Sequence, residues 1–172
     1  GPNSLDDGDE DYISRVYTAT LYVQIPSLWF TSDRTGLIID YNYTEMVDKQ
    51  TNQELIDNAV IGSNGGTFIG MGVEAVWDSR DNLFFPNDGK YSSMKFLSYP
   101  MGDFNFYSFE LDVRSYSSLT KNHVIAGQAY FLTSGGDIPF YKSPALGGQN
   151  RMRGYYYGRY RDNVYFTLQL EY

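Results

Sequence analysis

The side chains that could carry out chemistry are few, and the familiar catalytic constellations are incomplete. The chain of 172 residues has no cysteine, which excludes a disulfide framework, a thiolate zinc site and a cysteine nucleophile. Its only histidine, His123, would have to support a triad or a metal site alone, and a polar residue at a strand end is the simpler interpretation. Neither a Gly-x-Ser-x-Gly hydrolase turn nor a Gly-Lys-Ser/Thr phosphate loop occurs. We therefore expect no enzyme activity, no cofactor and no metal site.

Two charged segments could bind ions or nucleic acid, but neither has the required pattern. The acidic run at 6–11 lacks the spacing of a calcium loop, and a solvated tail is the simpler interpretation. Four arginines between 151 and 161 accompany an Arg-Gly-Tyr sequence that is similar to an RNA-recognition strand, whose aromatic side chains stack on bases. That fold requires two amphipathic helices, which the sequence does not show, and the net charge of −8 opposes binding to phosphates. No nucleic-acid partner is expected.

The composition favours β-strands over helices. The chain contains 17 Tyr, 17 Gly and 11 Phe, residues that suit pleated strands and tight turns. No window of eighteen apolar residues exists and the mean hydropathy is −0.42, which excludes a transmembrane helix. A membrane-spanning β-strand needs only about 9 to 11 residues with every second one apolar, so a low mean hydropathy is compatible with a transmembrane barrel.

Alternation of apolar and polar residues recurs in seven segments that are separated by turn-forming clusters. The fifth segment is the clearest, because Tyr107, Phe109, Leu111 and Val113 alternate with Ser108, Glu110, Asp112 and Arg114. The alternation is weaker in the fourth and sixth segments. The seven segments are 15–25, 37–44, 67–78, 91–99, 107–114, 123–132 and 164–172.

The polar faces of these segments carry charges of both signs, which two kinds of fold could accommodate. In a barrel they could pair across a water-filled lumen, and in a soluble β-sandwich they would face solvent. The connections favour the barrel, because two are long, at 47–66 and 133–163, and two are shorter, at 79–90 and 117–122. Long loops on one side and short turns on the other are typical of outer-membrane barrels.

We expect a single β domain over residues 12–172. The opening Gly-Pro-Asn-Ser looks like a remnant of protease cleavage, so residues 1–11 are interpreted as that remnant followed by an acidic tail. The chain shows no internal repeat, no coiled-coil heptad and no linker that would divide it.

Two segments carry motifs that occur together in a known family. The first motif contains Gly147, Gly148, Arg153, Gly154 and Tyr155. The second motif contains Asp78, Arg80, Asp81, Asn82, Pro86 and Gly89. In their order and approximate spacing, the two motifs resemble the long loop and a periplasmic turn of the BamA/TamA family, the bacterial surface antigen barrels. The resemblance covers residues 12–172.

This resemblance implies an all-β, antiparallel, up-and-down transmembrane β-barrel in the bacterial outer membrane. It also implies a protein that assists insertion of outer-membrane proteins or translocation of polypeptides. The expected partners are outer-membrane lipid or lipopolysaccharide and unfolded outer-membrane proteins. In the family the long loop folds back into the barrel and its arginine pairs with lumen carboxylates, a role that falls here on Arg153. A planar guanidinium suits such pairing because it can hold a carboxylate by two bonds.

The sequence departs from the family in its strand number. The family barrel has sixteen strands and usually follows POTRA domains, whereas about seven or eight strands are visible here and the strand that usually receives the arginine is missing. The chain is therefore interpreted as a fragment, or as a short relative that closes by itself or with a second copy. The candidate lumen carboxylates are Glu74, Glu110, Asp112 and Glu171.

Two alternatives from other functional classes remain open on the sequence alone. One is a small structural or ligand-binding outer-membrane barrel without insertase activity. The other is a soluble β-sandwich that serves as an interaction module.

Overall fold

The computed structural model describes residues 12–25, 32–48, 60–120, 123–148, 151–152, 154–155, 158 and 160–172. These residues form seven strands and one short 3-10 turn, and no helix among them has the length and apolar character needed to cross a membrane. The elements are β1 (Ile13–Ile25), β2 (Arg34–Asp48), β3 (Gly65–Asp78), β4 (Gly89–Gly102), β5 (Phe106–Thr120), β6 (His123–Gly136), η1 (Phe140–Lys142) and β7 (Val164–Glu171).

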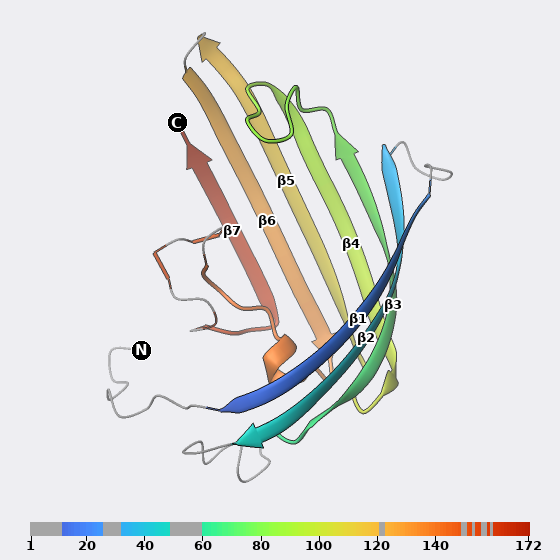
Figure 1. The fold of residues 1–172 in the computed structure, drawn as a ribbon. Coiled ribbons are helices and arrows are strands. Elements are labelled where there is room, and N and C mark those ends of the chain that lie inside the picture. Colours follow the sequence, from blue (N-terminus) through green and yellow to red (C-terminus); the bar gives the residue numbers. More distant parts are fainter. Residues whose placement is uncertain are drawn as a thin grey trace.

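The strands form one antiparallel sheet in which each strand pairs with its neighbours in sequence, in the order β1 to β7. The sheet curves into an open half-cylinder with a concave and a convex face (Figure 1). This arrangement confirms the expected all-β, up-and-down architecture. Six of the seven strands are longer than the alternating segments from which they were predicted, because pairing continues where the alternation fades, as at 115–120 in β5. The exception is β7, which ends at Glu171, one residue before the predicted end.

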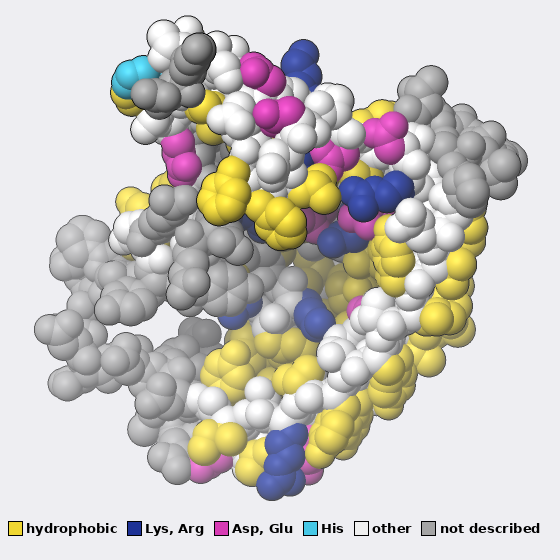
Figure 2. All heavy atoms as spheres, turned by 45° about the horizontal axis from the view of Figure 1, so that its top comes forward, with side chains coloured by type: hydrophobic (Ala, Val, Ile, Leu, Met, Phe, Trp, Pro, Cys, Tyr) yellow, Lys and Arg dark blue, Asp and Glu magenta, His cyan; other side chains and the backbone are white. Residues whose placement is uncertain are grey.

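The convex face is apolar and uncovered. Cross-strand pairing aligns Leu37, Val73, Phe96 and Phe109 in one row across β2 to β5. The first three of these side chains are exposed, and Figure 2 shows hydrophobic side chains along the outer wall. A β-sandwich would bury such a face beneath a second sheet, which the described residues do not form, so the soluble sandwich is excluded. The exposed apolar face is the one expected to contact lipid.

The concave face carries the polar residues that alternate with these apolar ones along each strand. Pairing aligns Glu74, Lys95 and Glu110 in one row across β3, β4 and β5. The most deeply buried polar side chains, including Asn42 and Asp112, belong to this same face. Charges of both signs are therefore collected on the inner wall, as expected for a water-filled lumen.

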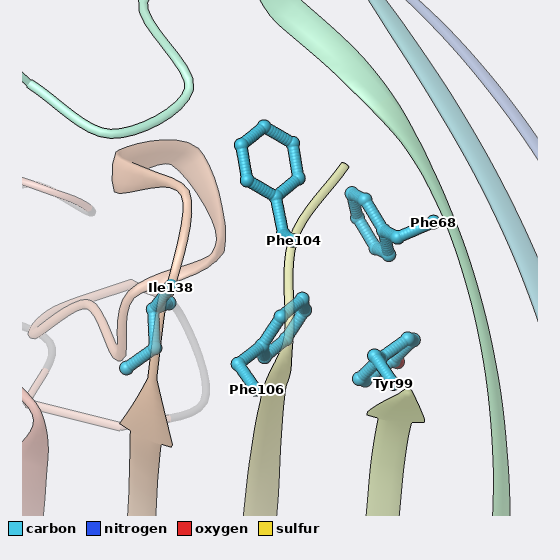
Figure 3. Close-up of a cluster of buried hydrophobic side chains, with 5 residues drawn as sticks. All are labelled: Phe68, Tyr99, Phe104, Phe106 and Ile138. Carbon is cyan, nitrogen blue, oxygen red and sulfur yellow. The ribbon is translucent and has the colours of Figure 1, made fainter. Parts of the chain in front are cut away.

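One end of the concave face departs from this polar pattern. Five apolar residues pack there between the sheet and the start of the β6–β7 connection, namely Phe68, Tyr99, Phe104, Phe106 and Ile138 (Figure 3). The rings of Tyr99 and Phe106 stack with their centroids 4.4 Å apart. This cluster provides a small hydrophobic core where the loop joins the wall.

A β-bulge in β4 shapes this cluster. In the register of β3 and β4, Gly70 lies opposite two residues, Tyr99 and Pro100. Proline cannot donate to a strand ladder and is tolerated at such an irregularity. A Cβ atom at position 70 would lie 2.4 Å from the Tyr99 ring, so glycine leaves the space that the ring occupies.

The connections separate by length between the two ends of the sheet, with one exception. β2 and β6 end at the end of the sheet that is lower in Figure 1, so the connections 49–64 and 137–163 start there, whereas β1, β3 and β5 end at the opposite end, where the connections 26–33, 79–88 and 121–122 start. The short connection 103–105 also lies at the lower end, because β4 and β5 meet there in a tight turn. By the pattern of outer-membrane barrels, we expect the lower end to be the extracellular one.

The assignment of the two faces can be tested by placing a charge on each. Leu111 lies on the convex side of β5, opposite Met94 and Phe131. We expect Leu111→Arg to lower the free energy of unfolding in lipid bilayers by about 2 to 4 kcal/mol if the site is near the bilayer midplane. The control Gln169→Arg puts the same charge on the concave side of β7 and is expected to cost much less. Equal losses in the two variants would show that the faces are assigned wrongly.

Candidate functional site on the concave face

The connection between β6 and β7 folds back on itself as a two-armed loop. Its arms are joined by a bridge between Ala145 and Arg161 and by a hydrogen bond from the Leu146 amide to the Tyr160 carbonyl, 2.9 Å long. Gly147 and Gly148 follow with φ angles of +102° and +107°, which side chains with a Cβ rarely adopt. The two glycines of the first motif therefore allow the chain to change direction at the start of the loop tip.

An arginine from this loop reaches the inner wall. Arg151 places Nη2 3.6 Å from Oε1 of Glu110, and its Cζ lies 3.2 Å from the centroid of the Tyr130 ring. Glu110 is also 2.8 Å from Nζ of Lys95, so its carboxylate lies between two cations. Tyr130 is only 2% exposed, which makes the stacking surface a fixed part of the wall. The contact joins the loop to β5 and β6 through charge and through a cation–π interaction.

The expected anchor, Arg153, lies outside the described residues, so its pairing stays a prediction. Its neighbour Gly154 has open space where a Cβ would be, so close packing does not require glycine at this position. Tyr155 is half-exposed and packs edge-on against Tyr160 on the returning arm, with ring centroids 6.2 Å apart. Within the described part of the loop, the arginine that contacts a lumen carboxylate is Arg151.

The four candidate carboxylates have different surroundings. Glu74 accepts a hydrogen bond of 2.9 Å from the Tyr22 hydroxyl, on β1. Asp112 is buried and accepts bonds from Arg114 and Gln128, at 2.6 and 2.9 Å. Glu171 is exposed near the end of β7. Glu110 contacts Arg151, a described arginine of the loop.

A second anchor was not anticipated from the sequence. Nζ of Lys142 in η1 donates a 2.8 Å hydrogen bond to Oδ1 of Asn42 on β2 and lies 5.5 Å from the centroid of the Phe68 ring. Burial lowers the pKa of Lys142, although Asp40 nearby opposes this effect. Asp40 in turn accepts hydrogen bonds from Asn42 and from the Tyr99 hydroxyl, at 2.6 and 3.0 Å. The contact joins residues a hundred positions apart, and no motif or spacing pointed to it.

The second motif forms a compact turn between β3 and β4. Arg80 donates to both carboxylate oxygens of Asp78, at 2.8 and 2.6 Å, and its guanidinium lies 4.8 Å from the centroid of the Tyr91 ring. Asp81 accepts the backbone amides of Asn82, Asn87 and Asp88, at 2.9, 2.9 and 3.2 Å.

Asn82, Pro86 and Gly89 complete this turn. The side chain of Asn82 accepts the amides of Phe84 and Phe85, and Pro86 is partly buried. Gly89 has a φ of +109°, and a Cβ there would lie 2.3 Å from the Ser79 carbonyl oxygen. The motif residues therefore act together to hold one rigid turn.

Comparison with known proteins decides the family. A family model described as the Omp85 superfamily domain matches residues 3–172. The chain belongs to the Omp85 superfamily. It is thus an Omp85-type outer-membrane β-barrel chain of bacteria, as the two motifs implied. The match begins at residue 3, before the expected start of the barrel at residue 12. The boundary between tail and barrel therefore stays a prediction.

A solved structure supports the same fold. The crystal structure of BamA from Haemophilus ducreyi lacking POTRA domains 1–3 is similar with a TM-score of 0.68 and 17% sequence identity. The match covers 86% of this chain and 31% of that one, so the Omp85 chain spans about a third of the BamA chain. No curated protein matches it.

The anchoring role of Arg151 can be tested by limited proteolysis. We expect Arg151→Ala to raise the cleavage rate between residues 144 and 161 several-fold, with little change in thermal stability, because strand pairing is untouched. Arg151→Lys should restore protection only partly, since an ammonium group lacks the planar face that stacks on Tyr130. Arg153→Ala is the matched comparison. If it alone accelerates cleavage, Arg153 is the anchor and Arg151 is not.

The turn at 79–88 should respond to acid through Asp81. Hydrogen bonds from the amides of Asn87 and Asp88 hold the pKa of this carboxyl below its usual value of about 3.9. Because the folded-state pKa is depressed, the carboxylate stabilises the turn above the usual value, and this effect is lost as pH falls through the lower one. Carbon-13 NMR titration of the carboxyl should give a midpoint below about 3.9. A midpoint at or above that value would contradict the assigned hydrogen bonds.

Proposed function

We propose that this chain forms part of the barrel wall of a factor that assists insertion of outer-membrane proteins or translocation of polypeptides across the outer membrane. The observation that carries the proposal is the returning loop, which Arg151 joins to Glu110 on β5 and Lys142 joins to Asn42 on β2. A loop held at two points on the inner wall occupies the lumen in a defined way. Such a barrel is suited to handling polypeptide rather than to free passage of solutes.

The task requires no covalent chemistry. An unfolded barrel strand entering lipid must find partners for its backbone amides and carbonyls, because unpaired groups cost several kcal/mol each in hydrocarbon. A wall made of paired strands with a polar inner face lowers that cost during transit. We infer that unfolded outer-membrane proteins are the substrates and that lipid or lipopolysaccharide surrounds the convex face.

The proposal also assigns partners to the edges of the sheet. Within the described residues β1 pairs only with β2, and β7 pairs only with β6. Bare edges in lipid would leave N–H and C=O groups without partners, so we infer that further barrel strands or a second copy of the chain cover them.

A second candidate function is a barrel that binds a small polar ligand and has no insertase activity. A hollow of about 390 Å³ on the concave face favours it, and the lining includes Arg114, Gln128, Arg151 and Gln169. The volume lies within the range of small-molecule sites, although such sites are usually more apolar.

Insertion into proteoliposomes separates the two functions. Liposomes containing the protein should convert an unfolded test barrel into its heat-modifiable, folded form faster than empty liposomes do. Arg151→Ala should reduce this rate because the loop is released. The control Arg15→Ala removes an exposed 3.7 Å ion pair with Glu45 and is expected to leave the rate unchanged. A wild-type rate equal to that of empty liposomes would refute the insertase and favour the ligand-binding barrel.

A further inference from the structure

The turn between β3 and β4 carries an exposed apolar tip, which we define as Leu83, Phe84 and Phe85. Their side chains are 63%, 85% and 81% exposed, and Phe84 is the most exposed large hydrophobic residue in the described part of the chain. Three consecutive apolar side chains in solvent are unfavourable unless a partner covers them. The tip is therefore a feature that the fold of the chain alone does not explain.

The backbone beneath the tip is held firmly. Asp81 and Asn82 together accept five backbone amides of the turn, including those of Phe84 and Phe85 themselves. Arg80 and Asp78 close the base of the turn with their ion pair of 2.6 Å. The two phenyl rings are thus presented on a preorganised support, which lowers the entropy that a partner must overcome in order to bind.

The turn leans towards the concave side of the sheet. Asp88 Oδ1 accepts the Ser118 amide at 3.0 Å, and the Ser118 hydroxyl donates to the Asn87 carbonyl at 3.2 Å. Ser118 follows Asp112 and Arg114 on the concave side of β5, since alternate residues share a face. Figure 2, which brings this end forward, shows hydrophobic side chains at the rim of the hollow. The tip therefore stands at the mouth of the lumen rather than on the lipid-facing wall.

We propose that the apolar tip is a binding site for an extended polypeptide in which aromatic or aliphatic residues alternate with polar ones, as in the strands of an unfolded outer-membrane barrel. The identity of this ligand rests on the proposed function. Such a segment offers a large apolar side chain on one face at every second residue, about 6.8 Å apart, which two adjacent phenyl rings can contact.

The surroundings of the tip favour a polypeptide over lipid. Asp81 and Asp88 place carboxylates directly beside it, and these repel the phosphates of lipid headgroups. Arg80 donates to the Leu83 carbonyl at 3.4 Å, but its charge is balanced by its ion pair with Asp78. The position of the tip at the opposite end from the long loops places it where a chain arriving from the periplasm would enter.

The strand β7 provides a defined probe, because Val164, Phe166, Leu168 and Leu170 alternate with polar or aromatic residues. A fluorescent peptide of residues 164–172 is titrated by anisotropy against the full chain in nanodiscs, with empty nanodiscs subtracted. We expect Phe84→Ser/Phe85→Ser to weaken binding at least about tenfold, because two apolar contacts are lost. Leu119→Ser, which alters an exposed apolar residue at the same end of the sheet, should change binding less than about twofold.

Three outcomes would overturn the inference. These are wild-type affinity in the double variant, an equal loss in Leu119→Ser, and equally tight binding of a peptide of the same composition with scrambled alternation. Heat-modifiable gel shifts verify that each variant is folded. The insertion assay on the same preparations keeps the two proposals separate. Tip-dependent peptide binding without insertion refutes only the proposed function, whereas insertion together with tip-independent binding refutes only this inference.

Discussion

The structure depends on one constraint, that every backbone polar group facing lipid must be paired within the sheet. Seven strands joined in sequence order satisfy it everywhere between the outer edges of β1 and β7. The two-residue alternation follows from it because each strand then has one wet and one lipid-facing side. A slip of one residue would exchange the two faces, so register and polarity are coupled. The irregularity at Tyr99 and Pro100 is tolerated because the extra residue is absorbed in a bulge on β4.

Within that frame, electrostatics on the inner wall position the loop. Glu110 forms ion pairs with Lys95 of the sheet and with Arg151 of the loop, so one carboxylate connects the loop to the wall. Asp112, two residues further on, is already occupied by Arg114 and Gln128. The charges on alternate residues of one strand thus have separate tasks, one holding the loop and one stabilising the wall.

The architecture could be predicted from the sequence more fully than the site. All seven strands and the faces of 107–114 followed from alternation, because lipid and water impose opposite polarity on neighbouring residues. The aromatic cluster around Phe68 could not be predicted, since it places apolar side chains on the wet face beneath a loop. The hydrogen bond between Lys142 and Asn42 depends on the path of that loop, which the alternation of apolar and polar residues does not determine. The pairing expected for Arg153 lies outside the described residues and stays a prediction, whereas the contact of Arg151 was not anticipated from the motif.

The two attachments of the loop also have a mechanical consequence. One lies on β2 and the other on β5, so the two attachments lie on strands that are separated by β3 and β4 along the arc of the sheet. Flattening or tightening the arc changes the distance between the two attachment points. The curvature of the wall and the contacts of the loop are therefore coupled, because a change in one alters the geometry of the other.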